Sequence, residues 1–196
     1  MAGDFTLEGA NGDIALEILK EVTDVLDENS IEYWLEGGTL LGVVRENRLL
    51  PWDNDMDISI KEDYYDKFIE ILPQLNKLNR SVRVRKFTKD NEPFKKGISR
   101  IVKVRNKKMY FFRGEVTLDI FIKFKKDDEY FWQVGEKKKS VPSYFYDELI
   151  EYAFDGKQYL IPKAYEAYLT FRYGDWKIPV KEWDTFKDDK AVKGDI

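Results

Sequence analysis

The feature that most constrains this chain is a pair of aspartates, two residues apart, at the start of a short apolar strand. Residues 55–60 read DMDISI, so the carboxylates of Asp55 and Asp57 alternate with apolar side chains. Side chains alternate across a strand, which puts both carboxylates on the face opposite the apolar one. Aspartate is depleted in strands, and two carboxylates about 5–7 Å apart repel by about 2–3 kcal/mol at an effective dielectric of about 20. A cation relieves this repulsion, so we expect a metal site here.

Carboxylate oxygens are hard ligands, typical of sites for Mg²⁺ or Mn²⁺, and Mg²⁺ commonly binds carboxylates together with substrate phosphates. A third carboxylate, Asp119, lies in the apolar run of residues 116–122, where a buried charge needs a partner. Two interpretations are open: an ion pair with an arginine such as Arg100, or a third metal ligand on a neighbouring strand. We favour the second, so metal-assisted phosphoryl transfer is the first functional hypothesis. Its expected catalytic and metal-binding residues are Asp55, Asp57 and Asp119.

Two absences narrow the chemistry, because the chain contains neither cysteine nor histidine. Without cysteine there is no disulfide, thiolate metal site or thiol nucleophile. Without histidine there is no Ser-His-Asp triad and no His-ligated zinc. Catalysis must therefore come from carboxylates, Lys, Arg, Tyr, hydroxyl groups and a metal held by oxygen. The net charge of −4 also disfavours a nucleic-acid partner.

The 196 residues, 43% hydrophobic and 36% charged, are typical of one globular domain. We expect that domain to cover residues 1–180, followed by a polar, loosely packed C-terminal tail over residues 181–196. No apolar run reaches the roughly 18 residues of a membrane-spanning helix, and no basic segment followed by an apolar core indicates a secretory signal. The expectation is a cytoplasmic protein without a transmembrane segment, and peripheral membrane association stays compatible with these features.

Hydrophobic spacing predicts the elements along the chain. The expected helices cover residues 11–29, 39–44, 62–72 and 163–173, and the expected strands cover 31–35, 55–60, 81–87, 98–105, 108–112 and 115–123. Arg113-Gly114 is expected to turn the chain between the last two strands. Residues 149–161 are expected to form a hairpin that turns at Asp155-Gly156, whereas residues 127–143 show no clear pattern.

Gly37-Gly38-Thr39 lies between a predicted strand and a predicted short helix. Glycine pairs mostly serve turns, and that interpretation stays open. At this position, however, the backbone N–H groups of Gly37, Gly38 and Thr39 can approach a phosphate, and the helix N-terminus adds partial positive charge. Arg45, in the loop expected over residues 45–54, is a candidate clamp for phosphate oxygens.

Three further residues complete the expected substrate-binding set. Trp52 and Asp53 lie in the loop directly before the paired aspartates. Trp52 has the alternative of packing in the core or in a lid. Arg100 is the third, with the alternative of an ion pair to Asp119 given above.

The segments around the glycine pair and the paired aspartates resemble the LicD family, which includes bacterial phosphocholine transferases and fukutin-type proteins. The family's usual core is G-T-L-L-G-x-x-R followed by P-W-D-x-D-x-D-I, and this chain has GTLLGVVR at 38–45 and PWDNDMDI at 51–58. The segment TLDIF at 117–121 is similar to the family's third-carboxylate strand. Similarity to its C-terminal block follows in YAFDG (152–156), Ile161-Pro162, YEAYL (165–169) and YGDW (173–176).

The resemblance covers residues 17–176 and implies an α+β fold of the nucleotidyltransferase type, with a mixed β-sheet flanked by helices. It implies transfer of a phospho-alcohol, such as phosphocholine or ribitol phosphate, from a CDP-activated donor to a hydroxyl of a glycan or related acceptor. It also implies Mg²⁺ or Mn²⁺ at Asp55, Asp57 and Asp119. Many members carry Asp where this chain has Asn54. Asn54 does not lie on the metal-facing side of the expected strand, so we expect activity to survive this departure.

Two other functions stay open on the same fold. The chain could transfer a nucleoside monophosphate from a nucleoside triphosphate to a small-molecule hydroxyl, and the metal carboxylates do not distinguish this reaction from phospho-alcohol transfer. It could also be a non-catalytic binding module, which the three intact carboxylates disfavour. Within the first reading, Asp119 is the expected group to orient or deprotonate the acceptor hydroxyl, because no histidine is present.

The sequence does not decide the alcohol. A choline donor carries a quaternary ammonium, which favours an aromatic cage. The aromatic candidates are Trp52, Tyr110, Phe111, Phe112, Tyr173 and Trp176. Lys and Arg are abundant over residues 80–113, which suits a polyol or an anionic acceptor better.

Overall fold

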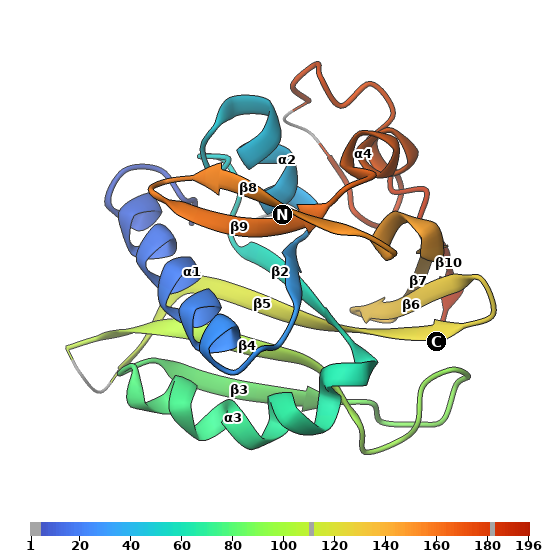
Figure 1. The fold of residues 1–196 in the computed structure, drawn as a ribbon, viewed down its shortest axis with the longest axis horizontal. Helices are drawn as coiled ribbons and strands as arrows, with labels where there is room; N and C mark the ends of the chain where they lie inside the picture. Colours follow the sequence, from blue (N-terminus) through green and yellow to red (C-terminus); the bar gives the residue numbers. More distant parts are fainter. Residues whose placement is uncertain (1–4, 110–111, 181–182) are drawn as a thin grey trace.

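The computed structural model describes residues 5–109, 112–180 and 183–196 (Figure 1). Four α-helices, two short 3₁₀ helices and ten strands follow one another along these residues. In chain order they are α1 (Ala10–Glu28), β1 (Tyr33–Leu35), α2 (Gly37–Glu46), β2 (Met56–Lys61), η1 (Glu62–Tyr64), α3 (Tyr65–Lys77), β3 (Ser81–Lys86), β4 (Ser99–Lys108), β5 (Phe112–Lys126), β6 (Glu129–Val134), β7 (Lys137–Pro142), η2 (Ser143–Tyr146), β8 (Leu149–Phe154), β9 (Lys157–Pro162), α4 (Tyr165–Tyr173) and β10 (Val192–Asp195).

Eight of these strands form one mixed sheet around the long strand β5. Strand β2 pairs with β5 in parallel, whereas β1, β3, β4, β6, β7 and β10 pair antiparallel with their neighbours. Strands β8 and β9 form a separate hairpin. The expected α+β fold with a mixed sheet flanked by helices is confirmed.

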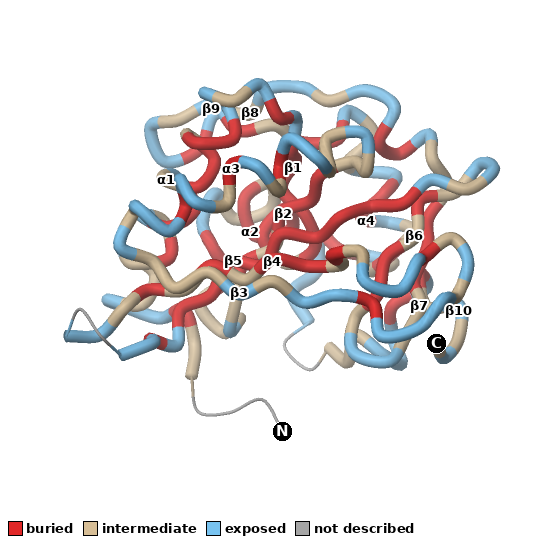
Figure 2. Tube along the Cα trace, turned by 90° about the horizontal axis from the view of Figure 1, so that it is seen from below, coloured by how far each residue is buried: buried red, intermediate tan, exposed pale blue. Residues whose placement is uncertain are grey.

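The core follows the alternation that the sequence predicts. Met56, Ile58 and Ile60 of β2 are fully buried, and they lie in register with equally buried Leu118, Ile120 and Ile122 of β5. Burial of each such side chain stabilises the fold by about 1.5–3 kcal/mol. Helix α1 packs against β4 and β5, and α3 packs against β3 and α1, on the same side of the sheet (Figure 1). Figure 2 shows this buried centre along β2, β5 and β4, with exposed segments around it.

Several element boundaries differ from expectation. Helix α2 begins at Gly37 and includes both glycines and Arg45. It starts early because the Glu36 carboxylate accepts the Gly37 N–H and the Glu36 carbonyl accepts the Leu40 N–H. Helix α3 continues past Pro73 to Lys77, since its buried face, which includes Leu75, extends beyond the proline.

The turn expected at Arg113-Gly114 is wrong, because both residues lie inside β5. Lys108 already pairs with Phe112, so the chain reverses between these two residues. Gly114 instead serves packing: a Cβ at this position would collide with the side chain of Asn106 on the paired strand. In the sequence alone, a glycine that is required by a close contact between strands cannot be told from a glycine that is required by a turn.

The remaining differences concern the second half of the chain. Residues 127–143, which showed no clear pattern, form the hairpin β6–β7. The hairpin expected to turn at Asp155-Gly156 is confirmed as β8–β9. The loose packing expected at the end of the chain is wrong for residues 189–195: Asp189 and Ala191 are buried, and β10 pairs with β7. No helix among the described residues is long and apolar enough to cross a membrane.

Candidate metal and phosphate site

Three carboxylates meet where β2 and β5 run side by side. Asp57 and Asp119 are directly opposite each other in the parallel pair, and Asp55 comes one residue before β2 begins. One oxygen from each of Asp55, Asp57 and Asp119 lies within 4.8 Å of the others. The structure therefore brings together the three residues that the sequence selected, from two segments about sixty residues apart.

The three carboxylates disfavour one another's ionised form. Burial, with the charges of Asp119 and Asp53, raises the pKa of Asp55 to about 7. Burial and Asp55 raise the pKa of Asp57 well above its ordinary value. Burial also raises the pKa of Asp119, although Lys103 partly opposes that rise. A cation placed among these oxygens would remove the repulsion.

The donor set fits a hard divalent cation. All three groups offer oxygen, which suits Mg²⁺ or Mn²⁺. Asp119 Oδ1 is buried and has no hydrogen-bond partner among the described residues. A buried carboxylate oxygen without a partner is costly, and coordination to a metal would satisfy it.

The direct partner of Asp119 is Lys103 and not Arg100. Lys103 lies opposite Asp119 in the antiparallel β4–β5 pair, and its ammonium group donates to Asp119 Oδ2. Arg100 instead donates to the Gln133 carbonyl at 3.4 Å. The ion-pair alternative for Arg100 is therefore wrong. Arg100 also makes no direct contact with the three carboxylates, so this geometry does not support the substrate-binding role expected for it.

Gly37 and Gly38 bring the first turn of α2 against the carboxylates. Gly37 has φ of +55°, which favours glycine, and a Cβ there would lie 2.9 Å from Asp57 Oδ2. A Cβ on Gly38 would collide with Asp53 Oδ2. The hydroxyl of Thr39 accepts the Asp57 N–H at 2.8 Å and so fixes the start of β2. The sequence motif thus builds a helix N-terminus, with its partial positive charge, directly beside the acidic cluster.

The structure does not place Arg45 beside this cluster. Arg45 is in the last turn of α2, eight residues or about 12 Å along the helix from Gly37. Its guanidinium donates to Glu46 and, at 3.1 Å, to the Trp176 carbonyl. Arg45 therefore joins α2 to the segment after α4, and nothing in this geometry brings it to a phosphate at the carboxylates.

Trp52 and Asp53 occupy the connection before β2. Trp52 is partly buried and packs against the core, as its alternative interpretation expected. Asp53 accepts the Asn54 N–H at 2.9 Å, and burial raises its pKa. Its charge adds to the repulsion felt by Asp55 and Asp57. Asp53 is thus a fourth carboxylate beside the site.

The aromatic candidates for a choline cage that the structure describes come from separate elements. The Tyr173 hydroxyl lies close to Gly37, and the Tyr173 ring contacts Trp183 at 4.9 Å between centroids. Trp176 is buried, whereas Phe112 is 67% exposed at the start of β5. Tyr110 and Phe111 lie outside the described residues.

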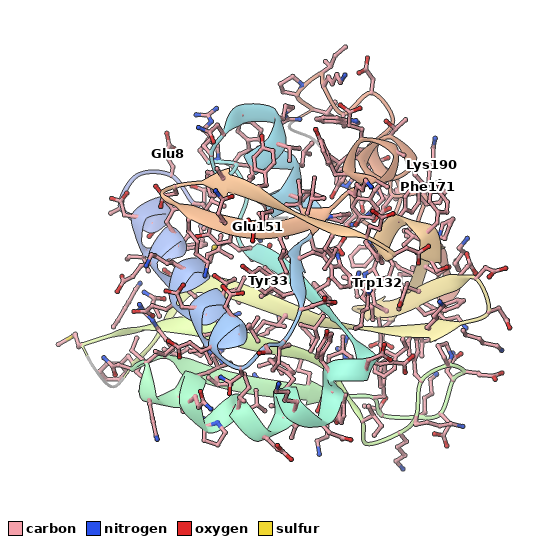
Figure 3. All side chains as sticks on the ribbon, in the orientation of Figure 1. Glu8, Tyr33, Trp132, Glu151, Phe171 and Lys190 are labelled. Carbon is pink, nitrogen blue, oxygen red and sulfur yellow. The ribbon has the colours of Figure 1, made fainter. Side chains whose placement is uncertain are left out.

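Sequence reasoning missed a buried group of charges behind the site, centred on Glu36. The Glu36 carboxylate accepts hydrogen bonds from Trp34 Nε1, Ser59 Oγ, Tyr146 OH and Arg172 Nη1, at 3.0–3.1 Å. Burial by itself would raise the pKa of Glu36, but Lys123 and Arg172 lower it below the ordinary value. Lys123 lies 3.2 Å from Glu36 and 3.3 Å from the centroid of the Trp132 ring, whose position Figure 3 labels.

The charge group continues into the C-terminal segment as far as Asp189. Arg172 and Lys139 both donate to the Asp189 carboxylate, and all three side chains are almost completely buried. Glu36 precedes α2 directly, so this ionic cluster links the C-terminal segment to the helix that borders the carboxylates. The sequence feature that could have indicated this cluster is Glu36, an acidic residue directly after the apolar run 31–35.

A mixed sheet flanked by helices, with carboxylates on two adjacent strands beside a helix N-terminus, defines a nucleotidyltransferase-type fold. The solution structure of the antibiotic-resistance factor ANT(2'')-Ia is similar, with a TM-score of 0.51 over 89% of this chain and 78% of that one. Sequence identity is 16%, so this likeness shows the fold alone.

The family model described as LicD/FKTN/FKRP, nucleotidyltransferase domain, matches residues 30–164, and the chain belongs to this family. Human ribitol-5-phosphate transferase FKTN is 27% identical over 177 residues, which cover 87% of this chain and 34% of that protein. The lipopolysaccharide cholinephosphotransferase LicD of Haemophilus influenzae is 34% identical over 58 residues, covering 30% of this chain and 22% of that protein. The chain spans less than two thirds of the length of the curated relatives it matches.

Proposed function

We propose that this protein is a metal-dependent transferase that moves a phospho-alcohol from a CDP-activated donor to a hydroxyl of a glycan. The observation that carries the proposal is the convergence of Asp55, Asp57 and Asp119 beside the N-terminus of α2, within a LicD-family domain. The printed names of the relatives, a cholinephosphotransferase and a ribitol-5-phosphate transferase, support the class of group transferred.

In this proposal Asp55, Asp57 and Asp119 hold a Mg²⁺ or Mn²⁺ ion. The ion, when bound, supplies positive charge that neutralises the donor diphosphate and the departing CMP. Gly38 and Thr39 lie in the first turn of α2, where backbone N–H groups have no acceptor within the helix, so these N–H groups are suited to donate to phosphate oxygens. Arg45 is left out of this role, because its guanidinium is held by Glu46 and Trp176.

Asp119 is proposed to orient the acceptor hydroxyl and to take its proton. The acceptor oxygen forms a bond to the phosphorus that bears the alcohol, while the bond from that phosphorus to the CMP oxygen breaks. Lys103 donates to one oxygen of Asp119 and favours the ionised carboxylate. Lys103 is therefore a positioning residue for the proton acceptor, and Lys103→Met is expected to reduce kcat more than it raises the KM of the donor.

The test is release of CMP from purified protein in the presence of Mg²⁺. CDP-choline, CDP-ribitol, CDP-glycerol and CDP-ethanolamine are compared, with EDTA and the Asp55→Asn variant as matched negative controls. We expect at least one CDP-alcohol to give Mg²⁺-dependent CMP release. The assay works without an identified acceptor, because slow transfer of the phospho-alcohol to water also releases CMP. The same assay identifies the alcohol.

Two results would replace the proposal. Release of pyrophosphate from CTP or ATP with an alcohol acceptor, with every CDP-alcohol inert, would assign nucleotidyl transfer to this site. Binding of a CDP-alcohol without turnover under any metal condition would assign a non-catalytic binding module.

A further inference from the structure

The β4–β5 hairpin ends in an exposed apolar tip. Met109 and Phe112 are 78% and 67% exposed, the highest values for large apolar side chains among the described residues. Lys108 pairs with Phe112, so these two apolar residues lie where the chain reverses. Figures 1 and 2 both show this end of β4 and β5 extending beyond α1 and away from the rest of the molecule. Packing in the core therefore does not account for either side chain.

Positive charge surrounds this tip. Residues 99–114 contain six Lys or Arg and no Asp or Glu. Lys107 lies opposite Arg113, and Lys108 lies opposite Phe112, in the antiparallel pair of strands. Opposite residues point to the same face and consecutive residues to opposite faces, so both faces of the hairpin carry a cation beside the apolar tip. We define the tip surface as Lys107, Lys108, Met109, Phe112 and Arg113.

The protein supplies little counter-charge to the tip surface. Lys108 pairs with Glu115 at 3.0 Å, but both side chains are exposed, and such pairs are weak and screened by salt. Over the parts of the chain that the structure describes, no carboxylate oxygen lies within 4.0 Å of a side-chain nitrogen of Lys107 or Arg113. Lys107 donates instead to the Asn79 side chain, at 3.5 Å. The tip surface is thus positive on a chain whose net charge is −4.

An anionic lipid bilayer matches both properties of the tip surface. Apolar side chains are stabilised at the boundary between headgroups and acyl chains, and Lys and Arg are attracted to anionic headgroups. A protein partner would need about 800 Å² on each side of a stable interface, which two apolar side chains on a projecting hairpin do not offer. Contact between the tips of two copies would bring like charges together. These observations therefore favour the bilayer as the occupant.

We propose that the tip surface docks the protein on anionic lipid bilayers. Met109 and Phe112 enter the interfacial layer, while Lys107, Lys108 and Arg113 contact the headgroups. Because the rest of the chain is acidic on balance, an anionic surface repels it, and docking is oriented with the hairpin toward the lipid. Phe112 is seven residues along β5 from Asp119, or about 24 Å of strand. The docking surface is therefore separate from the carboxylates and does not depend on the proposed reaction.

Sedimentation with lipid vesicles measures the docking. Vesicles of phosphatidylcholine with about 30% phosphatidylglycerol are compared with vesicles of phosphatidylcholine alone. We expect wild-type protein to bind the anionic vesicles at least about tenfold more tightly than the neutral ones. Met109→Ser/Phe112→Ser and Lys107→Gln/Lys108→Gln are each expected to weaken binding to anionic vesicles about tenfold.

A matched control removes two apolar side chains from another part of the surface. Ile178 and Val180 are 61% and 57% exposed, close to the values at the tip. Ile178→Ser/Val180→Ser is expected to bind anionic vesicles within about twofold of wild type. No binding by wild type, equal binding to neutral and anionic vesicles, or an unchanged affinity of the apolar tip variant would overturn the proposal. A tip variant that alters only the oligomeric state in sedimentation velocity would assign the tip to a second copy instead.

A fluorescent label shows which surface meets the lipid. The chain contains no cysteine, so Met109→Cys provides a unique site for an environment-sensitive dye. We expect the dye at residue 109 to shift its emission to shorter wavelength when anionic vesicles are added, because the interfacial layer excludes water. The same dye on Ile178→Cys is the control and should show no shift. If the protein sediments with vesicles while the dye at residue 109 stays in water, another surface makes the contact and the proposal is wrong.

Discussion

At the scale of the single residue, metal binding and burial have opposite effects on the ionisation of Asp57. In the proposed site the ionised carboxylate would hold the metal, yet burial beside Asp55 disfavours that form in the folded chain. We therefore expect Asp57→Asn to lose at least about 100-fold in kcat, since removing one stabilising group at developing charge costs about 2.7–4 kcal/mol. In EDTA at pH 8 the same variant is expected to gain about 0.5–2 kcal/mol in free energy of unfolding.

Urea unfolding and CMP release measure the two effects of Asp57→Asn. Glu151→Gln, which removes one negative charge from the exposed surface of β8, is the control and should change neither quantity. A metal-free Asp57→Asn variant that is less stable than wild type would show that Asp57 is a structural residue and not a strained ligand.

The raised pKa of Asp55 gives the metal-free protein a specific dependence on pH. Its pKa is about 7 in the folded chain, against 3.8 ordinarily, so the folded state binds more protons between these values. Stability of the metal-free protein should therefore fall as pH rises from about 4 through 7. Asp189 acts in the opposite sense, but its pKa is lowered, so it loses charge only below this window.

If the three carboxylates hold Mg²⁺ as proposed, the ion should reverse that trend, because it would bind their deprotonated forms and stabilise the folded state by mass action. We expect Mg²⁺ at about 5–10 mM, a concentration suited to a site of millimolar affinity, to raise the Tm more at pH 8 than at pH 5. Circular dichroism melts with Mg²⁺ or EDTA at four pH values measure it. An equal shift at both ends would contradict carboxylate ligation.

The site residues that the sequence predicts are those recognisable from neighbouring residues in the chain, and the residue that it misses depends on pairing between distant strands. Asp55 and Asp57 were found because one strand's alternation places them together. Asp119 was found because a carboxylate stands out in an apolar run. Lys103 was missed because its role depends on the register of β4 against β5, which local alternation does not determine.

At the scale of elements, hairpin β8–β9 was predictable because alternating strands flank Asp155-Gly156, and both turn residues have positive φ. The turn between β4 and β5 was misplaced because Gly114 is required by Asn106 of the neighbouring strand. Strand β10 was missed because its segment is polar, and what holds the segment in place is a buried charge at Asp189.

Asp189 offers a direct test of how this polar segment is held. Asp189→Ala leaves Arg172 and Lys139 buried without their shared carboxylate. Removing one partner of a buried ion pair costs about 3–5 kcal/mol, and we expect that loss in the free energy of unfolding from urea titration. Asp195→Ala is the matched control, since the Asp195–Lys137 pair is exposed and its loss should cost less than about 1 kcal/mol.

At the scale of the whole molecule, the ionic cluster makes the C-terminal segment part of the domain that holds the site. Asp189 binds Arg172, Arg172 binds Glu36, and Glu36 accepts the first N–H of α2. Ending the chain after residue 180 should therefore weaken both the fold and the carboxylate site. We expect at least about 3–5 kcal/mol lost from the free energy of unfolding, a large part of the roughly 5–15 kcal/mol that such domains possess.

The same truncation should also reduce the rise in Tm that Mg²⁺ causes at pH 8, because the start of α2 loses part of its support. A chain ending after residue 191 is the control: it keeps Asp189 and Ala191 but lacks β10, so it separates the ionic cluster from strand pairing. We expect this control to keep most of the Mg²⁺ response. If the chain ending after residue 180 unfolds cooperatively, with wild-type stability and a wild-type response to Mg²⁺, then residues 183–196 are an independent tail and the buried cluster does not support the site.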